Sequence, residues 1–386
     1  MQTELNGYFD YAATTPLDPR VLEAMIPYFS QVFGNPSSIH TFGQAAEAGL
    51  ESARENLAAD LNCRAEEIIF TSGGTESDNL AVRGTALARR REHQSNHILV
   101  TPVEHPAVSN TVRQLSAEFG FEVELLPVDR FGRVDPQDVA RRIREDTALV
   151  SVIYANNEIG SINPISEIGE ICRIRGVPLH SDAVQAGAYL ELDVQRLKVD
   201  LLSLGAHKFY GPKGVGTLYL REGTDILATQ TGGGQEFGKR AGTQNIPYII
   251  GMAEAFHLAQ VERSERISSV RPLRDRIIGE VLEAVPESQL TGHPEQRLPN
   301  HASFVFKNVD GNALLILLDS QGFGCSSGSA CKTGDPAPSG VLLALGLEPE
   351  LALGSLRITL GRGSSPEGVQ ALIEALPEAV SRARRW

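Results

Sequence analysis

The stretch VDLLSLGAHKFYGPKGVGTLYL, residues 199–220, predicts both the fold and the centre of its chemistry. Its first apolar run has the length of a buried strand, and the glycines and proline of GPKG turn the chain into a second apolar strand. Lys208 therefore stands at a strand end, where partial desolvation lowers the pKa of an amine and prepares it to form a Schiff base with a carbonyl. On this stretch alone an exposed turn lysine is an equal alternative, and Lys213 is a second candidate inside the turn.

Two further stretches suit one cofactor. FTSGGTESDN, residues 70–79, is typical of a strand end, a glycine turn and a helix start, whose backbone N–H groups bind phosphate. PLHSDAVQ, residues 178–185, puts Asp182 after an apolar run, where a buried carboxylate keeps a pyridine nitrogen protonated. The alternative for Asp182 is a helix cap. Lysine, carboxylate and phosphate site together indicate pyridoxal phosphate.

Around these stretches the chain alternates between strands and helices. We expect strands at 67–71, 97–101, 121–126, 148–154 and 177–181, and helices at 75–91, 105–118, 135–144 and 164–175. This alternation predicts an α/β fold with a mostly parallel sheet, in which ligands bind at the carboxyl ends of the strands. The residues expected to converge at that rim are Thr71, Glu104, Asn156, Asp182 and Lys208.

Beyond residue 220 the pattern changes to long helices and isolated strands. Helices are expected at about 246–261, 261–285, 312–321 and 366–384, with strands in HASFVFKN and SLRITLG. We predict a large α/β domain over residues 15–260 and a small α+β domain that combines residues 1–14 with 261–386. A chain of 386 residues is long enough for both.

Composition limits the partners and the compartment. The net charge of -13 argues against nucleic acid or an anionic membrane as the main partner, and no apolar run reaches membrane-spanning length. The start lacks a basic segment followed by an apolar one, so we expect a cytoplasmic protein. The four cysteines are too scattered for a disulfide framework and have no CxxC zinc spacing, which leaves the reactivity of single thiols.

Ten short motifs together resemble the NifS/IscS cysteine desulfurases of the class V aminotransferase superfamily. In order they are FDYAATTP, NPSSIH, TSGGTESDN, VEHPAV, NNEIG, HSDAVQ, GAHKFYGPKG, GGGQEFGKRAGTQN, SSGSAC and SLRITLG. Most are weak alone, but ten in this order over nearly the whole chain are specific. The resemblance implies fold type I of the pyridoxal phosphate enzymes, and it favours Lys208 over Lys213 as the residue that binds the cofactor.

The resemblance also implies the other contacts of the cofactor ring. Asp182 binds the ring nitrogen, and His105, which is otherwise a helix cap or a core histidine, stacks on the ring and moves a proton. Gln185 binds the 3-oxygen, and Asn156 lies near the ring and the substrate.

The phosphate cradle resembles that of the family in Gly74, Thr75, His207 and Thr243. The equivalent of Thr243 reaches the partner subunit's phosphate, so the resemblance implies a homodimer. The chain departs from the family in two places, at Gly205, where serine is usual, and at Phe237, where arginine is commoner. Loss of the serine hydroxyl weakens cofactor binding by about 1 kcal/mol.

GCSSGSACKTGDPAPSG, residues 324–340, is rich in glycine, serine and proline, which predicts an exposed loop until a helix begins near Ser339. A sulfur that enters a site and then delivers its cargo elsewhere needs reach, which favours Cys331 as the nucleophile. The alternative is a buried small hydrophobe, a role that we expect for Cys325.

We therefore expect a cysteine desulfurase. Lys208 removes the Cα proton of L-cysteine, Arg357 rather than Arg362 binds the substrate carboxylate, and Cys331 takes the sulfur as a persulfide while L-alanine leaves. The resemblance implies an iron–sulfur scaffold or another acceptor protein as partner, with no intrinsic metal site, although the Cys331 persulfide can touch a cluster iron. The alternatives are a selenocysteine lyase or class V aminotransferase, and a non-catalytic scaffold that binds pyridoxal phosphate.

Overall fold

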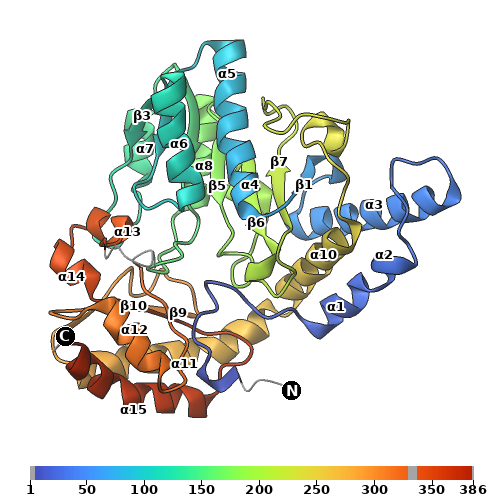
Figure 1. Ribbon diagram of the computed structural model, residues 1–386. Helices are drawn as coiled ribbons and strands as arrows, with labels where there is room; N and C mark the ends of the chain where they lie inside the picture. The colour runs from blue at the N-terminus through green and yellow to red at the C-terminus, as the bar shows by residue number, and fades with distance from the viewer. Residues whose placement is uncertain (1–4, 329–336, 385–386) are drawn as a thin grey trace.

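Two sheets organise the chain, one of seven strands and one of three. The computed structural model describes residues 5–328 and 337–384. Figure 1 shows the seven-stranded part above the three-stranded part, with the two long helices α10 (Ile246–Val261) and α11 (Arg263–Ala284) running from one to the other.

The large sheet has the strand order β1-β7-β6-β5-β4-β2-β3. Its strands are β1 (Ile68–Thr71), β2 (His97–Val100), β3 (Glu122–Leu125), β4 (Thr147–Ser151), β5 (Leu179–Asp182), β6 (Leu201–Gly205) and β7 (Gly216–Leu220). β7 pairs antiparallel with β1 and β6, whereas the remaining pairs are parallel. The mostly parallel α/β sheet is confirmed, and the carboxyl ends of β1, β2, β4, β5 and β6 lie on one rim.

Helices bury both faces of this sheet, and successive strand residues alternate between two cores. Leu201 packs in a core with α6 (Pro106–Phe119) and the helix that follows β1, whereas Leu202 packs in a core with α3 (Thr41–Leu61), α8 (Ile165–Arg175) and α10. The helix after β1 is continuous through α4 (Gly74–Asn79), a π turn (Leu80–Gly84) and α5 (Thr85–His93). The shorter helices in this part are α1 (Pro19–Met25), α2 (Pro27–Ser30), α7 (Pro136–Arg142) and α9 (Val194–Leu197).

The small sheet has the antiparallel order β10-β9-β8. Its strands are β8 (Ser288–Leu290), β9 (His301–Phe306) and β10 (Ser355–Thr359), and its helices are α12 (Gly311–Asp319), α13 (Gly340–Ala344), α14 (Pro349–Leu353) and α15 (Pro366–Ala383). The N-terminal segment lies beside it, because Tyr8 bridges to Gly324 and Asp10 bridges to Thr359. This placement agrees with the expectation for the first residues, while the domain boundaries remain a prediction.

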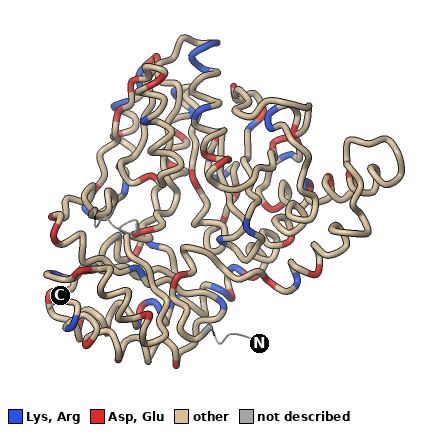
Figure 2. The backbone as a smooth tube through the Cα atoms, viewed as in Figure 1, with Lys and Arg blue, Asp and Glu red and all other residues tan. Residues whose placement is uncertain are grey.

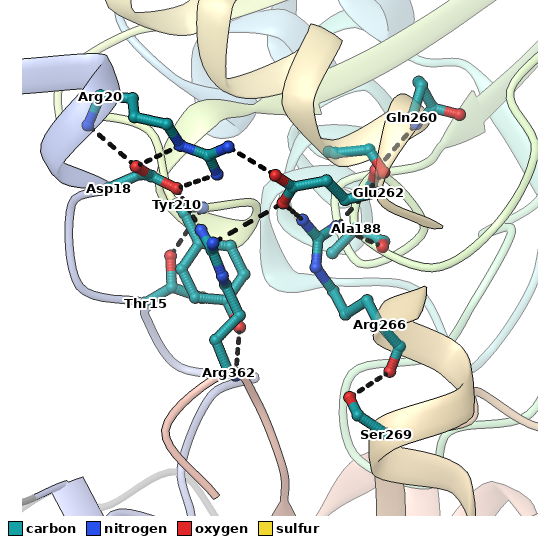
Figure 3. Close-up of polar contacts among 12 residues, drawn as sticks. Thr15, Asp18, Arg20, Ala188, Tyr210, Gln260, Glu262, Arg266, Ser269 and Arg362 are labelled. Carbon is teal, nitrogen blue, oxygen red and sulfur yellow. Dashed lines mark hydrogen bonds and ion pairs between the residues drawn. The ribbon is translucent and has the colours of Figure 1, made fainter. Parts of the chain in front are cut away.

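An ion-pair network joins the two parts (Figure 3). Asp18, which caps α1, is bound by Arg20 and by Arg362 from the loop after β10. Glu262, between α10 and α11, is bound by Arg20 at 2.5 Å and by Arg266 at 3.5 Å. Arg362 is therefore committed to this junction.

Charge is distributed over both parts of the molecule. Figure 2 shows Lys and Arg interspersed with Asp and Glu along the chain. Among the described residues, no helix combines the length and the apolar character that crossing a bilayer requires.

Candidate active site

A cavity of about 300 Å³ opens at the rim of the large sheet where β5 and β6 end. It is lined by Ala12, Ala13, Gly74, Thr75, Asp78, His105, Ile153, Asn157, Asp182, Val184, Gln185, His207, Lys208 and Arg357. Eight of the residues predicted from the sequence are among them: Gly74, Thr75, His105, Asp182, Gln185, His207, Lys208 and Arg357. The structure therefore gathers side chains from across the chain into one site.

Lys208 sits on the helical turn that directly follows β6. Its Nζ donates hydrogen bonds to the backbone oxygens of Ala12 at 2.7 Å and Ala13 at 2.8 Å. Burial, reinforced by the nearby Arg357 guanidinium, lowers the pKa of Lys208 to about 8. A substantial neutral fraction is then present near physiological pH, as a nucleophilic or basic amine requires. Lys213 is exposed and lies outside the cavity lining.

Asp182 ends β5 and is buried. Its Oδ1 accepts a hydrogen bond from Val184 N at 2.9 Å in the turn after β5, where no described helix begins for it to cap. Burial and the neighbouring Asp78 raise the pKa of Asp182 to about 6. A buried carboxylate short of hydrogen-bond donors suits a protonated pyridine nitrogen, because the nitrogen supplies the missing donor.

Asp78 is a cavity residue that the motif did not single out. It is 1 % exposed, and its Oδ1 lies 3.5 Å from His180 Nε2 without accepting a hydrogen bond from any described residue. Asp78, His105 and Asp182 each place one polar atom within 4.8 Å of the others. The helical period could have indicated it, since Asp78 is four residues after Gly74 and so shares its helix face.

His105 performs the capping role that was its alternative and also lines the cavity. It is the N-cap of α6, where Nδ1 accepts a hydrogen bond from Ala107 N at 3.1 Å. Burial lowers its pKa, which favours the neutral ring. Because Nδ1 is the acceptor, the proton of the neutral ring is on Nε2, and the cap fixes the orientation of the imidazole.

The phosphate end of the cavity is built from a helix start and small residues. Gly74 and Thr75 begin the continuous helix 74–93, where backbone N–H groups lack partners within the helix. A Cβ at Gly74 would lie 2.7 Å from Val184 Cγ2, so that the close approach requires glycine. His207 Nδ1 lies 3.1 Å from Thr14 Oγ1, and burial lowers its pKa to about 4. These residues fit a phosphate group.

Gly205 adjoins this phosphate cradle and has space for a Cβ. A Cβ there would lie 3.4 Å from Gly74 N and 3.6 Å from Val184 Cγ1, which are ordinary contacts. The departure from serine at this position is therefore not forced by packing.

Asn156 does not itself line the cavity. Its side chain is fully buried in the turn after β4, where Nδ2 donates to Val103 O and Oδ1 accepts from Glu158 N and Ile159 N. All three bonds hold the turn, and the next residue, Asn157, lines the cavity instead. Gln185 lines it as expected, with Nε2 bonded to Ala12 O at 2.8 Å.

Arg357, on β10, brings the small sheet to the cavity. Its Nη2 contacts Asp10 Oδ1 at 2.8 Å and its Nη1 donates to Asn157 O at 3.0 Å. Cys331 lies outside the described residues. Ser339, which follows that segment, caps α13, so that the predicted helix start is confirmed. Cys325 is half-buried, and its pKa is raised by burial, which suits a structural thiol.

Thr243 is exposed and lies outside the cavity lining. The segment that contains it is held by two ion pairs that the sequence analysis did not predict. Arg54 and Glu236 form a buried pair at 2.9 Å, and Arg240 binds Glu76, near the start of α4, at 2.7 Å. Phe237 adopts a left-handed φ of 56°, with its ring centroid 5.1 Å from the Arg54 guanidinium carbon. The aromatic ring therefore covers the buried cation where the family more often has arginine.

Comparisons with known proteins agree over nearly the whole chain. The family model for class-V aminotransferases matches residues 7–372. The cysteine desulfurase IscS of Methanosarcina thermophila is 45% identical, over 98% of this chain and 92% of its own. A solved structure of a NifS-like protein has a TM-score of 0.90 and 37% identity, and covers 97% of this chain and 99% of its own. The structure of SspA in complex with cysteine has a TM-score of 0.79 and 33% identity, over 93% of this chain and all of its own.

Proposed function

This chain belongs to the aminotransferase class-V family, and we propose that it is a cysteine desulfurase that uses pyridoxal phosphate and carries sulfur on Cys331. Desulfurase activity follows from its similarity to IscS enzymes over nearly its full length. The cofactor proposal rests on one observation. A single cavity contains a lysine of lowered pKa, a buried carboxylate and a helix that begins at a glycine, Gly74. When bound, pyridoxal phosphate draws electrons from the substrate Cα and so acidifies its proton.

The chain's own residues then have distinct tasks. Lys208 Nζ takes the Cα proton, since its pKa of about 8 leaves part of the amine neutral. Asp182 would accept the N–H of a bound cofactor, and His105, whose imidazole is fixed by its cap bond, would lie beside it. Arg357 binds the substrate carboxylate.

All atoms in the sulfur-transfer step come from L-cysteine and from Cys331. The Cβ–S bond of L-cysteine breaks, a bond forms between that sulfur and the Cys331 sulfur, and the products are L-alanine and a Cys331 persulfide. The attack requires the thiolate of Cys331. The described residues that precede Cys331 support this role for its sulfur. Ser326 pairs with Arg357 through backbone hydrogen bonds of 2.7 and 3.2 Å. Cys331 follows Gly328 by three residues in the sequence.

A homodimer is part of the proposal. Large apolar side chains are exposed together on α1, α2, the following loop and α3, and the most exposed is Ile39 at 94%. The others are Leu22, Ile26, Phe29, Phe33 and Phe42. An exposed apolar patch of this kind marks an interaction site, and we propose that a second copy of the chain covers it. In that dimer Thr243 would reach the partner's phosphate cradle, as the family resemblance implies.

The proposed product is protein-bound sulfur for an acceptor, either an iron–sulfur scaffold or another sulfur carrier. The free thiols of Cys63, Cys172 and Cys325 are typical of a reducing compartment and support a cytoplasmic location.

Turnover of L-cysteine tests the function. L-alanine and sulfide are measured, in the presence of a reductant, for the native protein, for Cys331→Ser and for the matched control Cys325→Ser. We expect L-alanine from the native protein and the control, and almost none from Cys331→Ser. Undiminished L-alanine from Cys331→Ser would reject the persulfide and favour a selenocysteine lyase. No L-alanine from any cofactor-loaded sample would indicate an aminotransferase or a non-catalytic scaffold.

A further inference from the structure

Asp10 is an acidic residue at the active site to which the motifs assign no role. Its carboxylate contacts Arg357 Nη2 at 2.8 Å, and the two residues are separated by 347 positions in the chain. Both side chains are largely buried, with 19% of Asp10 and 8% of Arg357 exposed. A buried contact of this length between charged groups is stronger than an exposed one.

Arg357 has five N–H donors, and two of them have partners among the described residues. A guanidinium carries five N–H groups, two on each Nη and one on Nε. One N–H of Nη2 is directed to Asp10 Oδ1 and one of Nη1 to Asn157 O. Nε is buried, without a hydrogen bond among the described residues. One N–H therefore remains on each terminal nitrogen, the pair that a bidentate carboxylate needs.

Asp10 belongs to a segment that is itself fixed at the site. Thr359 N donates to Phe9 O at 2.8 Å, and the Tyr8 hydroxyl donates to Asp10 O at 3.0 Å. Two residues later the same segment offers the backbone oxygens that accept from Lys208 Nζ. Asp10 can therefore hold the Arg357 fork at a constant distance from the amine that receives the substrate.

We propose that Asp10 is a positioning residue that orients Arg357 for the carboxylate of the amino-acid substrate. The proposal rests on the proposed function for the identity of that substrate. Arginine loses rotamer freedom when it binds a ligand, and a fixed partner removes that cost in advance. The Asn157 carbonyl serves the other terminal nitrogen in the same way. The negative charge of Asp10 also compensates the guanidinium before substrate arrives.

The test compares two ligands that have no Cβ–S bond to break and that differ in the carboxylate. Dissociation constants of L-alanine and L-alaninamide are measured by calorimetry with cofactor-loaded native protein, Asp10→Ala and Asp10→Asn. We expect Asp10→Ala to raise the dissociation constant of L-alanine about tenfold and that of L-alaninamide less than twofold. Asp10→Asn keeps an oxygen acceptor for Nη2, so we expect a weakening of L-alanine of about threefold or less. With L-cysteine, KM rises in Asp10→Ala more than kcat falls.

Each other outcome decides against the proposal. If the binding of both ligands weakens equally, Asp10 has a general structural role. If the binding of L-alanine is unchanged, Asp10 has no part in recognising the carboxylate. Native protein that binds neither ligand would also overturn it. If Asp10→Ala does not fold, the comparison is made with Asp10→Asn, for which the L-alanine constant must still change more than the L-alaninamide constant. Because these are binding measurements, failure of desulfurase turnover in the native protein is a separate result.

Discussion

The Ser339 hydroxyl donates a hydrogen bond to Glu158 Oε2, which joins the cap of α13 to the turn beside the cavity. Gly328 lies against the same carboxylate, since a Cβ there would be 2.8 Å from Glu158 Oε2. The half-buried Glu158 side chain is thus bonded to Ser339 and lies against Gly328, on either side of the segment that contains Cys331. Burial raises the pKa of Glu158 to about 7.

Glu158→Ala should slow the sulfur step. Loss of the bond to Ser339 frees the start of α13, and a hydrogen bond contributes about 0.5–1.5 kcal/mol. We expect the first-turnover rate of L-alanine formation to fall about tenfold, measured by rapid quench. The control is Glu350→Ala, an exposed carboxylate on α14. Equal rates for the two variants would show that these anchor points do not govern the sulfur step.

Gly205→Ser should strengthen cofactor binding. The added Cβ meets only ordinary contacts, and the hydroxyl restores a donor beside the phosphate cradle, a gain of about 1 kcal/mol or a fivefold lower dissociation constant. Titration of the apoprotein with pyridoxal phosphate, followed by absorbance, measures it. Gly74→Ser is the contrasting variant, because its Cβ would lie 2.7 Å from Val184 Cγ2 and should weaken binding. Weaker binding in both variants would contradict the role given to Gly205.

Asn156 and Asn157 should separate stability from activity. Asn156→Ala removes three buried hydrogen bonds and should lower the free energy of unfolding by about 3 kcal/mol, measured in urea. Asn157→Ala removes a side chain that lines the cavity, so it should lower kcat/KM for L-cysteine while changing stability by less than about 1 kcal/mol. The reverse pattern would restore the original prediction for Asn156.

The fold was predictable wherever buried strands alternate with helices. Leu201 and Leu202 face opposite cores, as a period of two residues requires. At β4 a strand was expected to continue to residue 154, whereas β4 itself ends at Ser151. Val152 N and Tyr154 N still donate hydrogen bonds to His180 O and Asp182 O of β5, so the apolar run stays paired with β5 up to its expected end.

The site was predictable where one short motif carries one function, as at Lys208 and Asp182. Asp10 was missed because its role depends on Arg357, a partner 347 positions away. The buried pair of Arg54 and Glu236 was missed for the same reason, with 182 positions between them.

Asp78 provides the last prediction, on the pH dependence of apoprotein stability. Burial raises its pKa to about 7, from the ordinary 3.8 of an unfolded chain. A hydrogen bond with Ser203 lowers this pKa but only partly offsets the burial. The titratable groups near Asp78 are Asp182, Glu104 and His180, whose pKa is lowered by burial to about 4. Folded protein therefore keeps the Asp78 proton at pH values where unfolded protein has lost it.

The sign follows from this difference in bound protons. The contribution of protonated Asp78 to stability is complete below pH 3.8 and is lost as the pH rises through about 7. Asp78→Asn cannot lose a proton, so its free energy of unfolding relative to the native protein should rise between pH 4 and pH 8, by about 4 kcal/mol at most. Urea unfolding of both apoproteins at several pH values measures this, with the exposed Asp319→Asn as control. A difference that stays constant with pH would mean that Asp78 is already ionised in the folded protein, which its unpartnered, buried Oδ1 argues against.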